Sequence, residues 1–296
     1  MLRLWGGASV LCVLMMGLVA CSGSEPNVVK LGVGNDPKSQ NARKATSEAA
    51  KPSRAGAGKM VRIDGGMFSR GTPVGQGDEG EQPRRQIFVN TFWMDLYEVT
   101  VRDYKRCVDS GTCSVPDTGG LACSGPQYNW GKNDRLNHPV NCVSIVQARQ
   151  FCQWVGKRLP TEAEWEKAAR GPKDSREYPW GDTSPTCAQA CFNGDDQGCP
   201  NPTSCPVGTH PAGKSPYGLH DMTGNVWEWV SDHYAEDYYG AAPNRDPKGP
   251  RQPTGERVVR GGSFDDIGQY QRLAYRFNFE EPDSFSYVYI GFRCAK

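Results

Sequence analysis

Hydrophobic and polar positions first form a regular pattern in two stretches, residues 60–70 and 86–95. Both alternate in the manner of β-strands, most clearly at Gln86-Ile87-Phe88-Val89 and at Phe92-Trp93-Met94. Successive side chains of a strand point to opposite faces, so a strand with this pattern can bury one face and expose the other. The pattern therefore predicts strands in both stretches.

Two later stretches repeat apolar residues every three or four positions, which is the spacing of one face of an α-helix. The first helix should begin after Thr100, a residue suited to the N-cap, and should end at Gly111. The second helix should begin at Ser144. Their apolar faces comprise Val101, Tyr104, Cys107 and Val108 in the first helix and Ala148, Phe151, Cys152 and Val155 in the second.

A third helix is predicted by the signals at its two ends. Thr161 and Glu164 form a capping box at its start, and Gly171-Pro172 stops it. Residues 172–215 then show no apolar period and are expected to be almost entirely loop. Because no repeat or second domain is visible, residues 59–296 are expected to form one loop-rich α+β domain.

The first 21 residues have the composition of a secretory signal. Arg3 precedes an apolar run, residues 8–20, that is too short to span a bilayer. The run ends in Leu18-Val19-Ala20-Cys21, which resembles a bacterial lipobox, so Cys21 is expected to carry lipid and to become the mature N-terminus. Ser22 after this cysteine favours the outer membrane. The alternative is an ordinary secretory signal with a chance cysteine.

Residues 22–58 have the composition of a disordered tether. Ser, Ala, Lys, Gly, Asn and Pro dominate, and no aromatic residue is present, so too little apolar surface is available to offset the chain entropy lost on folding. The whole chain carries a net charge of +1, without the basic patch typical of nucleic-acid binding. We therefore expect no nucleic-acid partner, and contact with the membrane through the lipid anchor.

Twelve cysteines are present, of which two belong to the signal, Cys12 and Cys21. The even number that remains in an exported chain predicts five disulfides. The spacing of four later cysteines also suits zinc, but neither a Cys-x-x-Cys pair nor a His cluster lies nearby to support a zinc site. Those four, which allow three pairings, are Cys187, Cys191, Cys199 and Cys205, and the expected local pairs are Cys107 with Cys113 and Cys123 with Cys142.

Residues 217–229 concentrate candidate chemistry. Asp221 and Glu228 are hard oxygen ligands, and Gly224 and Asn225 can adopt the positive φ of a tight loop between them. Such a loop can aim carboxylate and carbonyl oxygens at a cation while the two neighbouring indoles pack beneath it. The same residues also suit an ordinary Trp-rich turn of the core.

Eight blocks, in order, resemble the formylglycine-generating enzyme family, also called sulfatase-modifying factors. They include Gly261-Gly262-Ser263-Phe264 and Gly291-Phe292-Arg293-Cys294, and together they extend over nearly everything from residue 59 to the end. The resemblance implies a C-type-lectin-like fold with little regular secondary structure, stapled by disulfides. It also implies a bond between Cys152 and Cys294, which is worth roughly 4 kcal/mol in the chain-entropy model. The eight blocks are residues 65–68, 95–100, 138–140, 156–166, 178–181, 217–229, 257–264 and 291–294.

The resemblance further implies a calcium site made by the side chains of Asp221 and Glu228 and the main-chain carbonyls of Gly224 and Val226. Oxygen ligands of this kind are the ones that Ca²⁺ prefers. Calcium, in a structural role, is therefore the expected cofactor. A second family site is implied at Asn193.

The chemistry of the family's oxidases is not expected in this chain. Members that make formylglycine oxidise a substrate cysteine with two cysteines of their own, which bind copper(I). These two positions fall near Asp266 and Gln271, and no cysteine lies between Cys205 and Cys294. Copper(I) is a soft ion that prefers thiolates, so copper is not expected and no catalytic residue is assigned. The four histidines do not form the His-rich bundle of an iron-dependent branch.

Two classes of function follow. The first is a lipid-anchored cell-envelope protein whose domain is a binding or scaffold module for an envelope protein or peptide. Its groove would be lined by Trp227, Ser263, Asp265 and Arg276, together with the aromatic and acidic side chains of residues 232–239. The second is an enzyme, either a formylglycine-generating oxidase of sulfatase maturation with displaced ligands or another oxidoreductase. Glycan binding is a third hypothesis, and it is supported by fold analogy alone.

Overall fold

Two antiparallel strand pairs form from the alternating stretches. The computed structural model describes residues 58–117, 123–172, 175–194, 199, 202–280 and 283–296, and the structural statements below concern these residues. Strand β1 (Met60–Ile63) pairs with β4 (Phe92–Asp95), and β2 (Gly66–Arg70) pairs with β3 (Arg85–Val89). Each predicted stretch is therefore two short strands. The break between β1 and β2 packs against the break between β3 and β4, because a Cβ on Gly65 would lie 2.9 Å from the main-chain nitrogen of Thr91.

The three predicted helices are confirmed together with their N-caps. They are α1 (Val101–Asp109), α2 (Ile145–Trp154) and α3 (Glu162–Arg170). The cap side chain of each accepts the main-chain N–H of the third helical residue, and in α2 and α3 that residue's side chain returns the bond to complete a capping box. The remaining helical elements of the described chain are α4 (Tyr238–Ala241) and the 3₁₀ turns Glu79–Glu81, Asn133–Arg135, Pro211–Gly213 and Gly268–Gln271.

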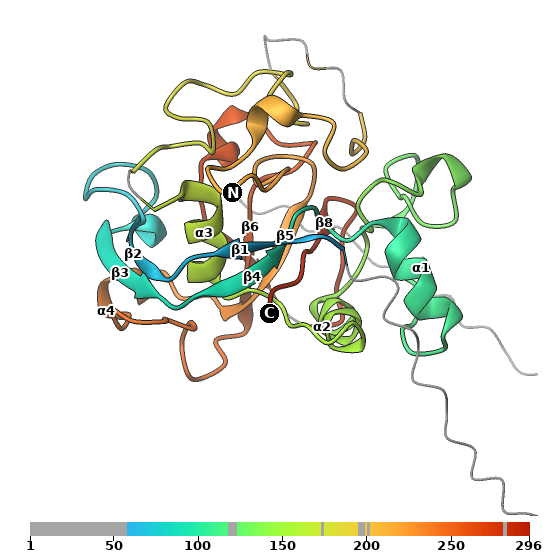
Figure 1. The fold of residues 1–296 in the computed structure, drawn as a ribbon, viewed down its shortest axis with the longest axis horizontal. Coiled ribbons are helices and arrows are strands. Elements are labelled where there is room, and N and C mark those ends of the chain that lie inside the picture. The colour runs from blue at the N-terminus through green and yellow to red at the C-terminus, as the bar shows by residue number, and fades with distance from the viewer. Residues whose placement is uncertain (1–57, 118–122, 173–174, 195–198, 200–201, 281–282) are drawn as a thin grey trace, which may run out of the picture. The chain divides into compact units, whose positions relative to one another are not determined.

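A four-stranded sheet is formed by the second half of the chain, in the order β7-β6-β5-β8. Strand β5 runs antiparallel to β6 and parallel to the short β8, while β7 is an end strand paired with β6. Helix α3 contacts β5 and β6 of this sheet as well as β2 and β3, so it lies between the sheet and the N-terminal strands (Figure 1). The strands are β5 (Trp227–His233), β6 (Glu256–Arg260), β7 (Phe277–Glu280) and β8 (Ile290–Gly291).

Helix α3 is buried along its entire length, including its charged side chains. Glu166 accepts hydrogen bonds from Arg170 and Arg260, both at 2.9 Å. These partners are required because an isolated charge inside a protein is strongly unfavourable. The sequence pattern predicted the helix but not its complete burial.

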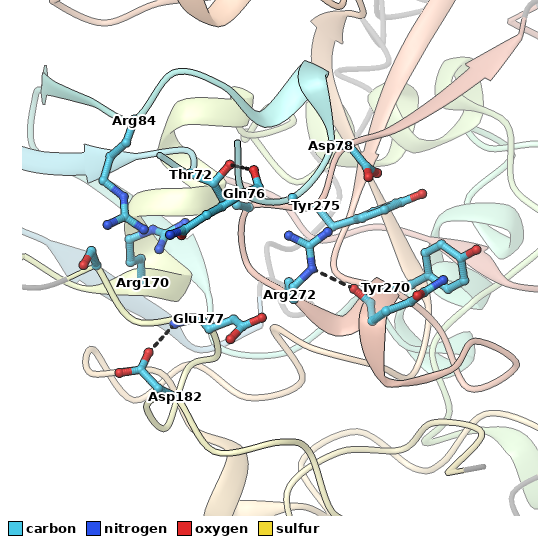
Figure 2. Close-up of a pocket in the computed structure, with 14 residues that line it drawn as sticks. Thr72, Gln76, Asp78, Arg84, Arg170, Glu177, Asp182, Tyr270, Arg272 and Tyr275 are labelled. Carbon is cyan, nitrogen blue, oxygen red and sulfur yellow. Dashed lines mark hydrogen bonds between the residues drawn. The ribbon is translucent and has the colours of Figure 1, made fainter. Parts of the chain in front are cut away.

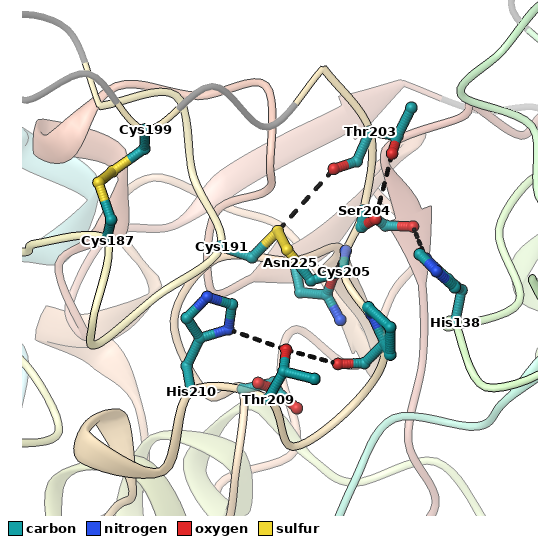
Figure 3. The surroundings of a disulfide bond; sticks show 12 residues. His138, Cys187, Cys191, Cys199, Thr203, Ser204, Cys205, Thr209, His210 and Asn225 are labelled. Atoms are coloured by element: carbon teal, nitrogen blue, oxygen red, sulfur yellow. Dashed lines mark hydrogen bonds between the residues drawn. A yellow bond between two sulfur atoms is a disulfide. The ribbon is translucent and has the colours of Figure 1, made fainter.

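Five disulfides staple the domain, as the cysteine count predicted. Cys152 of α2 is bonded to Cys294 near the C-terminus, which confirms the family pairing. The two expected local pairs are also present. Figure 3 shows how the four later cysteines resolve their three alternatives, and because all four are paired the zinc alternative is wrong. Their bonds are Cys187 with Cys199 and Cys191 with Cys205.

The expected fold class is confirmed: helices and strands are mixed, both are short, and long ordered loops join them. No helix of the described residues has the length and apolarity needed to cross a bilayer. The expected signal, the lipid-bearing Cys21 and almost all of the tether lie outside the described residues.

Candidate functional site

Asp266 and Gln271, near which the resemblance places the oxidase cysteines, lie side by side in the segment that follows β6. Gln271 donates from Nε2 to the main-chain oxygens of Ser263 (3.1 Å) and Asp266 (3.4 Å). The main-chain N–H of Ser263 donates to the Asp266 carboxylate at 3.0 Å, and the Ser263 hydroxyl donates to the same oxygen. The sequence count therefore identifies two residues that the fold does bring together.

Burial and packing, rather than a reactive group, characterise this centre. Burial raises the pKa of the Asp266 carboxyl, while hydrogen bonds from Ser263 and Trp227 act in the opposite direction. Ser263 is completely buried, so its hydroxyl is not placed to attack a substrate. Gln271 is buried under Gly262, where a Cβ would lie 2.7 Å from the amide oxygen of Gln271.

The described cysteines offer no free thiol to this centre. Every cysteine within the described residues takes part in a disulfide. A disulfide offers no thiolate, and a carboxylate beside an amide is a hard donor pair that suits a soft copper(I) ion poorly. The residues present at Asp266 and Gln271 therefore do not fit the copper centre of the family's oxidases.

A cluster of aromatic rings lies beside this centre, where the Trp227 side chain also hydrogen-bonds to Asp266. The ring of Trp227 lies 5.9 Å from that of Tyr275 and 5.5 Å from that of Phe277, and Tyr270 packs edge-on against Tyr275 at 5.0 Å. Beyond Phe277 the surface opens into a hollow of about 470 Å³ beside the end strand β7, which we call the aromatic groove. The aromatic groove is lined by Phe277, Asn278, Phe279, Glu280, Phe285, Tyr287 and Tyr289.

Part of the groove expected from the sequence is buried instead. Arg276 is only 5% exposed, and its guanidinium pairs with Glu162 of α3 at 2.7 Å. Asp232 and Tyr239 from residues 232–239 are also buried, so they do not form an exposed surface. Trp227 is buried too, whereas Asp265 is exposed. Arg276 and Asp232 thus contact Glu162 of α3 in the interior and do not line a groove.

The residues of the implied calcium site lie at the loop before β5 and at the start of that strand. Asp221 and Asn225 have positive φ values of 53° and 67°, so the tight turn expected from the sequence is present. The Glu228 carboxylate accepts hydrogen bonds from Arg293 (2.7 Å) and from the Trp165 indole (2.9 Å). Asp221 accepts the main-chain N–H of Gly208 at 2.7 Å. Glu228 is therefore engaged as the counter-ion of a buried arginine.

Glu98, which the sequence analysis missed, faces the same loop. Its carboxylate accepts the Asn225 side-chain amide at 2.6 Å, and burial, with Asp221 and Glu228 close by, holds its pKa well above the usual value. Three buried carboxylates thus lie near one guanidinium, that of Arg293, which is hydrogen-bonded to Glu228 and attracts Glu98 and Asp221 electrostatically. A divalent cation would stabilise the ionised forms of these carboxylates. Glu98 lies in a block that carries the resemblance, but no spacing rule connects it to a loop so far along the chain.

The donors at this loop fit calcium in charge and in chemical type. Within the described residues, no three His, Cys, Asp or Glu side chains converge in a metal-binding arrangement, so a cation here would also need main-chain carbonyls such as those of Gly224 and Val226. At the second implied site, Asn193 is exposed, and its main-chain N–H donates to the Asp266 carbonyl at 3.1 Å.

Comparison with known proteins supports the same family. The family model of the sulfatase-modifying factor enzyme 1-like domain matches residues 45–296. The serine/threonine-protein kinase pkn1 of Chlamydia caviae is 37% identical over 251 residues, a match that covers 80% of this chain but only 38% of that protein. The formylglycine-generating enzyme of Thermomonospora curvata is 35% identical over 286 residues and is covered over 92% of its length, with 80% of this chain matched.

Among solved structures, PvdO from Pseudomonas aeruginosa superimposes with a TM-score of 0.66 at 25% identity. The match covers 80% of this chain and 94% of PvdO. The fold, the five disulfides and the ordered sequence blocks agree with these similarities. The chain belongs to the family of the sulfatase-modifying factor enzyme 1-like domain.

Proposed function

We propose that this chain is a lipid-anchored cell-envelope protein whose domain binds an extended segment of another envelope protein and does not oxidise it. The observation that carries the proposal is the state of the cysteines: all ten cysteines of the described domain are in disulfides. Asp266 and Gln271, near which the resemblance implies the oxidase cysteines, offer no sulfur. An oxidase with displaced ligands would have to open one of these bonds to obtain a thiolate.

The aromatic groove is the surface that supports peptide binding. It lies along β7, the end strand of the sheet, and an extended peptide can add to such an edge through main-chain hydrogen bonds. Aromatic rings bury a large area at a small cost in side-chain entropy, and Phe285 in this groove is 48% exposed. The preferred occupant is a strand-like segment with aromatic or aliphatic side chains at alternate positions.

Two further features complete the proposal. The resemblance of residues 18–21 to a lipobox supports a lipid on Cys21, and the tether of residues 22–58 would then join the domain to the outer membrane. Calcium would occupy the loop at Asp221, where it would offset the charge of the buried carboxylates and stabilise the turn that leads into β5. Neither feature requires catalysis.

Copper content and free thiols test the proposal at low cost. The purified full chain, exposed to copper(I) and desalted, should retain no copper above a metal-free blank, and the denatured, unreduced chain should show no reactive thiol from the domain. Stoichiometric copper, or two free thiols within residues 187–205, would favour the oxidase.

For the anchor, Cys21→Ser should abolish lipidation, and an unchanged mass and membrane fractionation would contradict the lipobox.

Binding is tested by photo-crosslinking from β7. A crosslinker at Asn278, which is exposed on this strand, should capture a specific envelope peptide in cells. The additional substitution Phe285→Ala should reduce capture, because it removes apolar area from the groove. A matched crosslinker at the exposed Asp109 of α1 should not capture the same peptide. Capture that is equal from both positions, or that yields only glycan, would contradict a peptide groove.

A further inference from the structure

A second hollow, separate from the aromatic groove, has a volume of about 590 Å³. We call it the arginine cavity. It lies between the loop that joins β2 to β3, the segment after α3, and residues 269–275 (Figure 2). The arginine cavity adjoins the centre at Asp266 and Gln271, because Tyr270 and Arg272 line it, but neither Asp266 nor Gln271 does.

Arg84 is a partly exposed cation on the wall of the arginine cavity. Its Nε donates to the Gly71 carbonyl at 3.3 Å, and the terminal nitrogens of its guanidinium have no hydrogen-bond or ion-pair partner in the described structure. Burial and the neighbouring Arg170 lower the pKa of Arg84, while the carboxylates of Glu166 and Asp182 act in the opposite direction. Two guanidinium groups that repel each other at a cavity wall are stabilised by an anion, and a carboxylate matches the planar fork of Arg84.

Carboxylates occupy other parts of the same wall without neutralising Arg84. Asp78, Glu177 and Asp182 line the arginine cavity, and none of them forms an ion pair with Arg84. Glu177 is fixed in place through its main chain, which donates to Asp182 at 2.9 Å and accepts from Leu273 at 2.8 Å. Asp182 thus attracts Arg84 electrostatically, but no carboxylate of the wall pairs with Arg84 directly, and a ligand with both signs would add direct contacts.

An ion pair and a closely packed glycine hold the rim of the arginine cavity in place. Arg272 forms a two-point pair with the buried carboxylate of Glu81, with both distances 2.7 Å. Gly77 is required beside this pair, because a Cβ there would lie 2.4 Å from Glu81 and 2.8 Å from Arg272. Arg272 also lies 5.6 Å from the ring of Tyr275, so an aromatic wall adjoins the charged one. A preorganised site loses little entropy when it binds.

We propose that the arginine cavity binds a zwitterionic ligand of the amino-acid or short-peptide class. The ligand's carboxylate pairs with Arg84, its ammonium group faces Glu177 and the neighbouring acids, and an apolar or aromatic side chain packs on Tyr275. This assignment does not depend on what the aromatic groove binds, because the two hollows share no lining residue.

The probe is the dipeptide alanyl-phenylalanine, which carries both charges and one aromatic side chain. Isothermal titration of the full chain should detect the free dipeptide, with binding at least about tenfold weaker for its C-terminal amide and for its N-acetyl derivative, because each lacks one charge-assisted hydrogen bond. Equal affinities for the three compounds, or no binding of the free dipeptide at millimolar concentration, would overturn the proposal.

Two substitutions assign the ends of the ligand. Arg84→Gln should weaken binding of the free dipeptide about tenfold while leaving the weak binding of the amide unchanged. Glu177→Gln should do the same with respect to the N-acetyl derivative. The control is Arg251→Gln, which removes one exposed positive charge outside the cavity and should change nothing. If the Arg84 and Arg251 variants bind alike, the carboxylate site is not at Arg84.

Discussion

The carboxyl of Asp232 lies fully inside the protein, where it accepts the main-chain N–H of Glu162 at 3.0 Å and the Ser231 hydroxyl at 2.9 Å. Burial, reinforced by the nearby Glu162, raises its pKa from 3.8 to about 7. The folded protein therefore binds this proton more tightly than the unfolded chain does. By linkage, the stability that the proton confers is fully present below pH 3.8 and is lost as the pH rises through 7.

The substitution Asp232→Asn should remove this dependence. Wild-type stability should include a component that falls between pH 4 and 7, and the variant, which keeps an oxygen acceptor but cannot ionise, should lack it. Melting temperatures measured across this range provide the test, with Asp237→Asn as the control, since Asp237 is exposed. Parallel pH profiles for the wild type and the Asp232 variant would show that the carboxyl titrates normally.

Calcium should raise the free energy of unfolding through the loop at Asp221. A ligand that binds only the folded state at one hundred times its Kd adds about 2.7 kcal/mol. Asp221→Asn should lose most of the rise in melting temperature, because it removes one negative ligand and leaves the Glu228–Arg293 pair intact. The exposed Asp265→Asn is the matched control. An equal response to calcium and chelator in both variants would place the ion elsewhere.

At the scale of single residues, the sequence identified which side chains matter better than it identified their surroundings. It pointed to Asp221 and Glu228, and to Asp266 and Gln271. The fold brings Asp266 and Gln271 into contact with each other. The sequence did not indicate that Arg293 would form an ion pair with the Glu228 carboxylate. That contact joins positions 65 residues apart, so no local pattern carries it.

At the scale of elements, the bond between Cys152 and Cys294 closes a separation of 142 residues and fixes the C-terminus to α2. Replacing both cysteines by serine should cost about 2–5 kcal/mol, since the unfolded chain regains the freedom that the bond removed. Thermal melts would detect the loss. The control is the same replacement at Cys107 and Cys113, which close only 6 residues and should cost less. A smaller loss for the long-range pair would contradict this prediction.

The helices were predictable because their signals are local. Thr100, Ser144 and Thr161 mark the starts through hydrogen bonds that lie within four residues of chain. The burial of all faces of α3 was not predictable, because its partner Arg276 pairs with Glu162 across 114 residues. The pairing of the four cysteines between 187 and 205 was equally hidden, since every alternative closes a short loop.

At the scale of the whole molecule, the family resemblance was sufficient to predict the fold, whereas the function depends on the chemistry of a few positions. The same architecture holds an oxidised set of cysteines, an aromatic groove beside β7 and the arginine cavity. Fold similarity alone does not transfer an activity, because reactions depend on the groups at the site. On the basis of those groups we propose binding.

The most direct test of this conclusion is a turnover assay. The purified full chain, loaded with copper(I), is incubated in air with a sulfatase-type Cys-x-Pro-x-Arg peptide, and the peptide mass is followed. The formylglycine-generating enzyme of Thermomonospora curvata serves as the positive control under the same conditions. We predict no formylglycine mass shift with this chain, because every cysteine of the described residues is in a disulfide and offers no thiolate to the centre at Asp266 and Gln271. Conversion above that of a metal-free blank would contradict the proposal and make the protein an oxidase.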